Sequence, residues 1–66
     1  MNKSIYIYKS NIYRIVRETH FKHPQTREWL NAVIYTRADK ENGEWFVREK
    51  TEFFDRFKEV HPNVNI

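Results

Sequence analysis

The side chains best suited to bind a ligand are arginines and aromatic rings that occur close together along the chain. Guanidinium groups grip phosphate through paired N–H donors, and aromatic rings stack on nucleic-acid bases. The sequence therefore predicts a ligand site built from side chains, with the candidate residues Tyr6, Tyr8, Arg14, Arg17, Lys22, Arg37, Trp45 and Arg48. On a small sheet, Arg14 and either Arg37 or Arg48 are expected to converge as a basic strip, because alternate residues share a face.

Other kinds of chemistry fit the sequence less well. Gly43 is the only glycine, so no glycine-rich phosphate loop can form. Nucleophilic catalysis is not expected, because cysteine is absent and the only serines, Ser4 and Ser10, lie near the N-terminus. The acidic residues between 49 and 59 are typical of a solvated helix face. We therefore expect a protein that is not an enzyme and has no cofactor.

Three histidines raise the possibility of a metal site. His20 and His23 are three residues apart, and His61 could approach them from the C-terminal segment. A structural zinc ion needs four ligands, however, and without thiolates the others would have to be carboxylates. Surface or turn histidines are the simpler interpretation, and we expect no metal.

Charge is unevenly distributed along the chain. Residues 1–37 hold seven basic and two acidic residues, whereas residues 38–66 hold five basic and seven acidic residues. The asymmetry fits either a basic face for an anionic ligand or an attraction between opposite ends of neighbouring subunits.

The length of the chain limits it to one domain. Residues 1–66 are expected to form a single β-rich domain with an ordered core over about residues 4–60. So short a chain hides only about 60% of its unfolded surface, so aromatic burial and self-association are expected to add to its stability. We expect a homo-oligomer. The absence of cysteine, signal peptide and membrane span favours a cytoplasmic location.

Short apolar runs separated by turn residues predict antiparallel strands. The strands are expected at 5–8, 12–17, 29–36 and 45–48, with turns at 9–11, 23–26 and 39–43. Alternation predicts Tyr6 and Tyr8 on the face opposite Ile5 and Ile7, free to meet a partner, and Arg17 on the face opposite Arg14.

The longest apolar run and the C-terminal part complete the fold prediction. The run at 29–36 is apolar on both parities, which is typical of a central strand covered on both sides. The Asn42-Gly43 pair predicts a hairpin turn with positive φ. From Thr51, a suitable N-cap, the spacing of phenylalanines fits a short helix, or one helical turn before a last strand. The fold class is mainly β, a small antiparallel SH3-like half-barrel of three to five strands with a short C-terminal helical turn. Its expected core includes Tyr13, Trp29, Val33, Trp45, Phe53 and Phe57.

Six stretches in order form a recognisable pattern: Tyr13-Arg14-Ile15-Val16, His23-Pro24-Gln25-Thr26-Arg27-Glu28, Val33-Ile34-Tyr35, Gly43, Phe46-Val47-Arg48 and Phe53. Together they resemble an uncharacterised family of small bacterial and phage SH3-like barrel domains. The family pattern is Tyr-x-Val, His-x-x-Thr-x-Glu, Val-Val-Tyr, then Trp-Val-Arg-Pro and a phenylalanine. Glu49 stands where the family has proline, and about two extra residues precede Val33. The resemblance implies fold and size, and no activity.

Two functions follow from these observations. The first is a non-enzymatic binding protein for an anionic ligand, either nucleic acid or a small nucleotide, for example a phage protein that sequesters a signalling nucleotide. The alternative is a protein-protein interaction module or small inhibitor protein of phage or bacterial origin that uses aromatic and arginine anchors.

Overall fold

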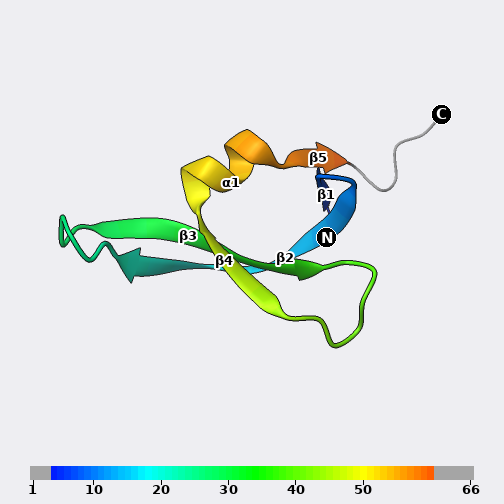
Figure 1. Ribbon diagram of the computed structural model, residues 1–66, viewed down its shortest axis with the longest axis horizontal. Helices are drawn as coiled ribbons and strands as arrows, with labels where there is room; N and C mark the ends of the chain where they lie inside the picture. Colours follow the sequence, from blue (N-terminus) through cyan, green and yellow to red (C-terminus); the bar gives the residue numbers. More distant parts are fainter. Residues whose placement is uncertain (1–3, 61–66) are drawn as a thin grey trace.

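Residues 4–60 fold into one open antiparallel sheet with a single short helix (Figure 1). The computed structural model describes residues 4–60. The sheet has the strand order β4-β3-β2-β1-β5, so β4 and β5 are its two edges. The predicted mainly β half-barrel with a short C-terminal helix is confirmed. The elements are β1 (Ile5–Tyr8), β2 (Asn11–Lys22), β3 (Trp29–Arg37), β4 (Trp45–Glu49), α1 (Lys50–Arg56) and β5 (Lys58–Val60).

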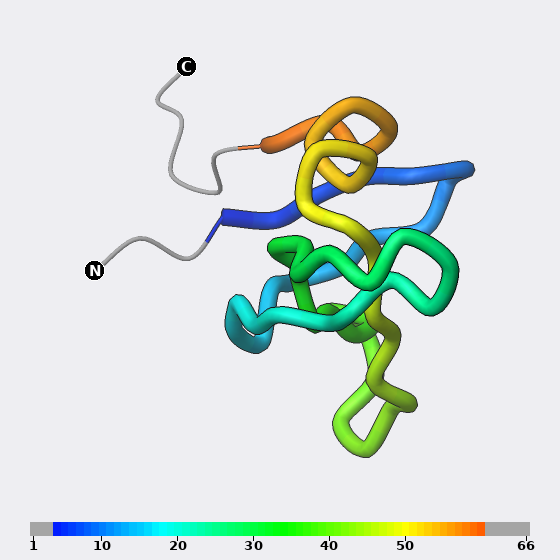
Figure 2. Tube along the Cα trace, turned by 90° about the vertical axis from the view of Figure 1, so that its left-hand side faces the viewer, coloured from blue at the N-terminus to red at the C-terminus, as the bar shows by residue number. Residues whose placement is uncertain are grey.

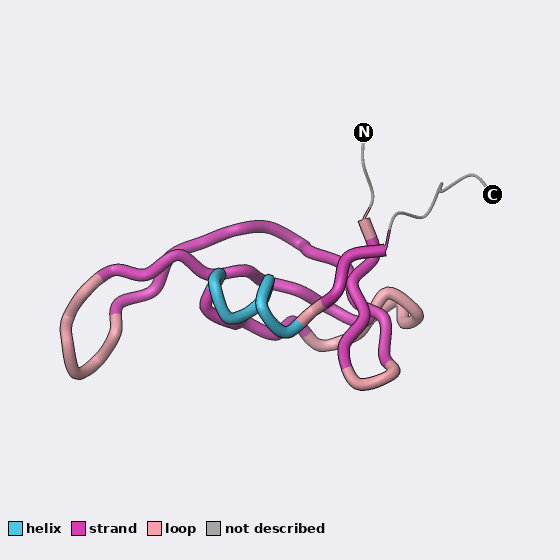
Figure 3. The backbone as a smooth tube through the Cα atoms, turned by 90° about the horizontal axis from the view of Figure 1, so that it is seen from above, coloured by secondary structure: helices cyan, strands magenta, loops and turns pink. Residues whose placement is uncertain are grey.

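The helix lies over one face of the sheet, and no helix covers the other face within residues 4–60. In Figure 1, α1 lies above β2, β3 and β4 and leads into β5, which runs beside β1. Figure 2 shows the same layering from the side, with α1, β1 and β5 together and the β3–β4 loop on the opposite side. The β2–β3 hairpin projects beyond the helix (Figure 3), which gives the molecule extents of 46 × 25 × 25 Å.

A cluster of aromatic rings between α1 and the sheet forms the core. Phe53 and Phe57, four residues apart, stack with ring centroids 4.1 Å apart. Tyr35 of β3 approaches each of them, with centroids 5.1 Å away. Offset and edge-on ring contacts of this kind add to the stabilisation from buried area. The buried cluster consists of Tyr6, Val33, Tyr35, Phe53 and Phe57, with Tyr13 packed against it. The predicted core positions of Val33, Phe53, Phe57 and Tyr13 are therefore right.

The predicted orientation of β1 is wrong. Tyr6 is only 8% exposed and contacts Phe53 edge-on, whereas Ile7 is exposed. The reason lies in the register, because Tyr6 pairs with Tyr13 and therefore shares the face that α1 covers. Burial raises the pKa of the Tyr6 phenol, and the nearby Glu59 carboxylate raises it further.

The tight turn between β1 and β2 uses residues that rarely adopt its geometry. Lys9 and Ser10 have φ of 51° and 68°, as the central residues of a two-residue type I′ hairpin require. Gly43, in contrast, does not have a positive φ, so the prediction for Asn42-Gly43 is right about the turn and wrong about its geometry. A Cβ at Gly43 would lie 3.1 Å from Thr36 Oγ1, so close packing against β3 accounts for this glycine.

Two side chains, those of His23 and Thr26, organise the β2–β3 loop. The Nδ1 atom of His23 accepts hydrogen bonds from the backbone N–H groups of Gln25 and Thr26, at 3.2 and 3.3 Å. The Thr26 hydroxyl accepts one from the N–H of Glu28. These contacts are typical of turns in which side chains replace backbone partners. The predicted loop at 23–26 is confirmed, and these side chains have a structural role in it.

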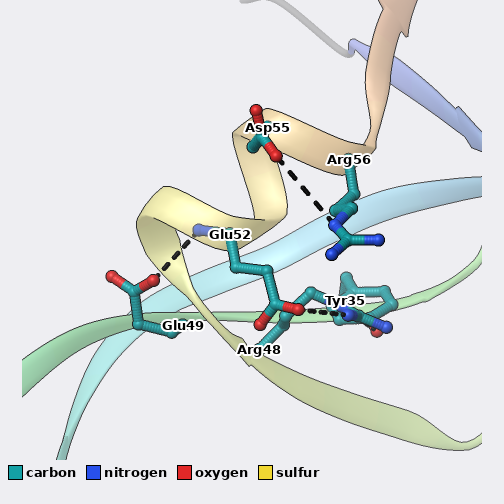
Figure 4. Close-up of polar contacts among 6 residues, drawn as sticks. All are labelled: Tyr35, Arg48, Glu49, Glu52, Asp55 and Arg56. Carbon is teal, nitrogen blue, oxygen red and sulfur yellow. Dashed lines mark hydrogen bonds and ion pairs between the residues drawn. The ribbon is translucent and has the colours of Figure 1, made fainter.

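The helix begins two residues earlier than an N-cap at Thr51 would predict. Glu49 is the N-cap, and its carboxylate accepts hydrogen bonds from the N–H groups of Thr51 and Glu52, at 3.0 Å each. Figure 4 shows the bond from Glu52. The cap has a φ of −59°, a value that proline also adopts. The short helix then leads into β5, as the second of the two predicted alternatives requires.

Candidate functional site

A bulge in β2 places two arginines side by side. The register between β2 and β3 shifts between Ile15 and Arg17, so one extra residue is present in β2. Arg14 lies opposite Thr36 and Arg17 lies opposite Ile34, two residues apart on β3. Both arginines therefore point to the same face, whereas simple alternation predicted opposite faces.

That face of the sheet is turned away from α1. Val33 and Tyr35 belong to the core, so Ile34 and Thr36 point the other way. Two rows of paired residues cross the sheet there: Arg14, Thr36 and Trp45, and beside them Arg17, Ile34 and Val47. Phe21 and Leu30, which pair with each other, extend this same face toward the tip of the β2–β3 hairpin. Ala32 and Thr36 have the same orientation but are buried, Thr36 against the β3–β4 loop, where its hydroxyl donates to the Glu44 carbonyl. The rest of this face, which we call the uncovered face, consists of Arg14, Arg17, Phe21, Leu30, Ile34, Trp45 and Val47.

The uncovered face exposes large apolar side chains. Trp45 is 63% exposed and Val47 is 57% exposed, and Ile34 beside them is half-buried. The assignment of Trp45 to the core is therefore wrong, and its assignment to a binding site remains a prediction. Trp29, also expected in the core, is 67% exposed, because it lies near the hairpin tip beyond the reach of α1.

Arg14 and Arg17 differ from the other arginines of the sheet in having no ion-pair partner within residues 4–60. Arg37, in contrast, forms a two-pronged contact with Asp39 at 3.0 and 2.8 Å. That contact lowers the pKa of the Asp39 carboxyl and raises that of the Arg37 guanidinium. Guanidinium groups without a carboxylate partner are available for an anionic group on a ligand.

Arg48 lies on the covered face among aromatic rings. Its Nε donates to the Tyr35 hydroxyl at 3.2 Å and its Nη1 to Glu52 at 3.3 Å (Figure 4). The guanidinium carbon lies 5.4 Å from the ring centres of both Tyr8 and Phe57, within cation–π range. The hydrogen bond with Tyr35 raises the pKa of Arg48. These contacts link three strands and the helix, and they give Arg48 and Tyr8 structural roles.

Lys22 is separate from the other candidates. It lies at the end of β2, opposite Trp29, with its ammonium group 5.9 Å from the centre of that ring. This pair occupies the tip of the projecting hairpin.

The eight candidate residues therefore do not form one site. The structure brings together Arg14, Arg17 and Trp45 on the uncovered face. The predicted convergence of Arg14 with Arg37 or Arg48 is wrong, because these residues lie on opposite faces of the sheet. The sequence prediction also missed Phe21, Leu30, Ile34 and Val47, of which Leu30 and Ile34 belong to the run that was expected to be covered on both sides. The sequence did contain one indication of this face: Leu30 and Ile34 are apolar and an even number of residues apart, so they share a face of the strand.

The histidines do not gather acidic or histidine neighbours in the part of the chain that the structure describes. No group of three or more His, Cys, Asp or Glu residues within residues 4–60 is placed to hold a metal ion. His61, the third histidine of the metal hypothesis, lies outside the described residues.

Comparison of the chain with protein-family models, curated proteins and solved structures found no match. Within residues 4–60, no helix is long and apolar enough to cross a membrane. The uncovered face is therefore the feature of this protein that best indicates a function.

Proposed function

We propose that this protein is a non-enzymatic interaction module that binds a protein partner through the uncovered face. One observation carries the proposal: an exposed tryptophan and valine lie beside a half-buried isoleucine and two arginines without ion-pair partners in residues 4–60. Contiguous exposed apolar surface on a small domain marks a site of interaction. Tryptophan and arginine are also the residues that most often dominate the binding energy of protein interfaces.

The chemistry of the face specifies the partner. Trp45, Val47 and Ile34 form an apolar strip across β3 and β4, and Arg14 and Arg17 border that strip on β2. A complementary surface has an apolar anchor for the strip and carboxylates for the arginines. We therefore expect an acidic partner with exposed large apolar side chains.

The acidic side chains near the core support a role without catalysis. Glu49 caps the helix, Glu52 pairs with Arg48, and Glu18 pairs with Lys50 at 3.0 Å. These carboxylates are engaged in contacts that stabilise the fold.

A second candidate function is binding of an anionic ligand, nucleic acid or nucleotide, at the same face. The specific observation in its favour is that Arg14 and Arg17 lie on adjacent same-face positions in the same two rows as Trp45 and Val47. Guanidinium groups would hold phosphate and the exposed indole ring of Trp45 would stack on a base. The aliphatic residues of the face have no role in this alternative, and for that reason the protein partner is our first proposal.

A peptide-display selection tests the proposal. Random peptides are selected on the wild-type protein, and the enriched sequences are measured for affinity in solution. We expect sequences that combine acidic and large apolar residues, whose affinity falls about tenfold or more in Val47→Asp and in Arg17→Glu. The matched control is Arg56→Glu, which makes the same charge change on α1 and should leave the affinity unchanged.

The salt dependence of binding distinguishes the anionic ligand from the protein partner. A mixed-sequence single-stranded oligonucleotide is titrated at two salt concentrations beside the selected peptide. Nucleic-acid affinity falls steeply with salt because phosphate contacts release counterions, whereas an apolar interface responds weakly. Tight, salt-sensitive oligonucleotide binding without enrichment of any peptide would contradict the first proposal and favour the second.

A further inference from the structure

The free edge of β4 differs from the other edge of the sheet. β4 contains three consecutive exposed apolar residues, Trp45, Phe46 and Val47, and its pairing with β3 is regular throughout. β5, at the opposite edge, has three residues that include Lys58 and Glu59. Short strands and charged side chains protect an edge against pairing with another chain, and a regular apolar strand does not. Only β4 is therefore suited to pair with a further strand.

The hydrogen-bond pattern identifies the backbone groups at this edge. The N–H of Ala38 donates to the carbonyl of Ile12 at 2.9 Å, so in β3 the even-numbered residues direct their backbone groups toward β2. Tyr35 and Val33 then direct theirs toward Phe46 and Arg48, their partners in β4. The backbone N–H and C=O groups of Trp45 and Val47 consequently point away from the sheet.

We propose that two copies of this chain pair through β4, antiparallel and centred on Phe46, to form one continuous sheet of both copies. In this register Trp45 lies opposite Val47 of the second copy, and these two residues exchange backbone hydrogen bonds. The two Phe46 side chains meet at the two-fold axis. Glu44 lies opposite Arg48 of the second copy, which also pairs with Glu52 of its own copy, so an acid and a base face each other on both sides of the axis.

The sequence of β4 is complementary to itself, which favours a second copy of the chain as the partner at this edge. The same strand supplies apolar residues opposite apolar residues and an acid opposite a base, as an isologous two-fold interface requires. Centring the pair on Val47 instead would place Trp45 opposite Glu49 of the second copy, which loses the apolar match. The paired dimer joins the uncovered faces of both copies, with the two Trp45–Val47 strips at its middle. This pairing uses the backbone edge of β4, so it does not depend on what the uncovered face binds.

Single-cysteine crosslinking tests the register, because the chain has no native cysteine. Residues opposite each other at a two-fold axis come close enough for a disulfide when they form a non-hydrogen-bonded pair. Phe46→Cys should therefore form a covalent dimer on mild oxidation, whereas Thr51→Cys, exposed on α1, should not. Crosslinking of Val47→Cys without crosslinking of Phe46→Cys would overturn the proposed register.

Sedimentation of variants tests the dimer itself. The wild-type protein should sediment as a dimer whose fraction rises with concentration, and Glu44→Arg, which sets arginine against Arg48 of the second copy, should shift it to monomer. Glu41→Arg, with the same charge change in the β3–β4 loop, is the matched control and should remain dimeric. Val47→Pro removes an outward N–H at an edge position and should also be monomeric. A wild-type monomer at all concentrations, or a dimer that persists in both Glu44→Arg and Val47→Pro, would overturn the proposal.

Discussion

Arg48 connects the elements of a core that is small for a protein domain. Its guanidinium group contacts the rings of Tyr8 and Phe57, the hydroxyl of Tyr35 and the carboxylate of Glu52. A planar guanidinium can stack on rings and donate in its own plane at the same time, which a lysine ammonium cannot do. The sequence analysis assigned Arg48 to a ligand site because arginine beside aromatic residues occurs both in ligand sites and in contacts within a fold. Only the register of β4 decides that it points toward α1.

Two aromatic residues that the sequence assigned to the core should respond differently to truncation. Phe53→Ala removes a ring that is 0% exposed, and it should lower the free energy of unfolding by about 3–5 kcal/mol. Trp45→Ala removes a ring that lies mostly in solvent, so the monomer's free energy of unfolding should change by no more than about 0.5 kcal/mol. Urea unfolding followed by circular dichroism, at a concentration where the protein is monomeric, measures both.

These two variants also distinguish a residue that stabilises the fold from one that binds a partner. If Trp45→Ala destabilised the monomer as strongly as Phe53→Ala, the indole ring would be part of the core and the uncovered face would lose its main anchor. The expected outcome is a folded Trp45→Ala variant with weakened affinity for the selected peptides.

At the level of elements, the sequence predicted the strands and loops well and their orientation poorly. Alternation assigned β1 the wrong way because Tyr6 and Ile7 are both good strand residues, and only the pairing of Tyr6 with Tyr13 fixes which faces the core. In β2 the predicted alternation of faces holds as far as Ile15, and beyond the bulge each residue lies on the face opposite the predicted one. A bulge has no reliable signal in a single sequence, because it depends on the fit of two strands. The partnership of Arg14 and Arg17 could therefore not be predicted.

The turn between β1 and β2 should be easy to stabilise. Lys9 and Ser10 have positive φ, which costs a residue with a side chain about 1–2 kcal/mol relative to the right-handed conformation. Replacing the pair with Asn-Gly, the preferred residues of a type I′ turn, should raise the free energy of unfolding by about 1–2 kcal/mol. Thermal and urea unfolding provide the measurement. Gly43→Ala is the contrasting variant, and it should destabilise the protein because the added Cβ crowds Thr36. A destabilised Asn-Gly variant would show that this turn does not have the assigned geometry.

The cap of α1 should make stability depend on pH in the acid range. Hydrogen bonds from the N–H groups of Thr51 and Glu52 lower the pKa of the Glu49 carboxyl below its ordinary value of 4.5. A carboxyl with a lowered pKa in the folded state stabilises the protein above the unfolded-state pKa, and this contribution is lost as the pH falls through the folded-state pKa. Glu49→Gln should therefore be less stable than wild type at neutral pH.

The difference between Glu49→Gln and wild type should shrink as the pH falls below about 4.5. Urea unfolding at a series of pH values measures it, with Glu41→Gln in the β3–β4 loop as a control that should follow the wild-type curve. A difference that stayed constant down to the acid limit would mean that the cap does not depend on the charge of Glu49.

At the scale of the whole molecule, one helix is enough to cover one face of the sheet and not the other. The apolar run at 29–36 predicted a central strand covered on both sides, and β3 is an interior strand with buried residues on both faces, Val33 and Tyr35 on one and Ala32 and Thr36 on the other. Within residues 4–60, however, no helix packs over the second face, where Ile34 is half-buried and Trp45 and Val47 of β4 are exposed. Ile34 and Trp45, which the sequence assigned to a covered strand and to the core, are therefore among the residues that we propose bind a partner. Composition cannot separate these two uses of apolar side chains, because burial inside a chain and burial against another molecule follow the same physics.

The projecting β2–β3 hairpin should open more easily than the part of the sheet beneath α1. Leu30 and Thr36 both direct their backbone groups toward β2, but Leu30 lies near the tip and Thr36 lies beside the core residue Tyr35. Backbone hydrogen bonds with few buried contacts around them open locally, and buried ones open only with global unfolding. In the free monomer, the amide of Leu30 should exchange with solvent deuterium about tenfold faster than that of Thr36, or more. Residue-resolved hydrogen exchange by NMR measures both amides in one sample. Equal protection of the two would mean that the tip is as stable as the core, and it would contradict the view that α1 alone determines which part of this sheet is rigid.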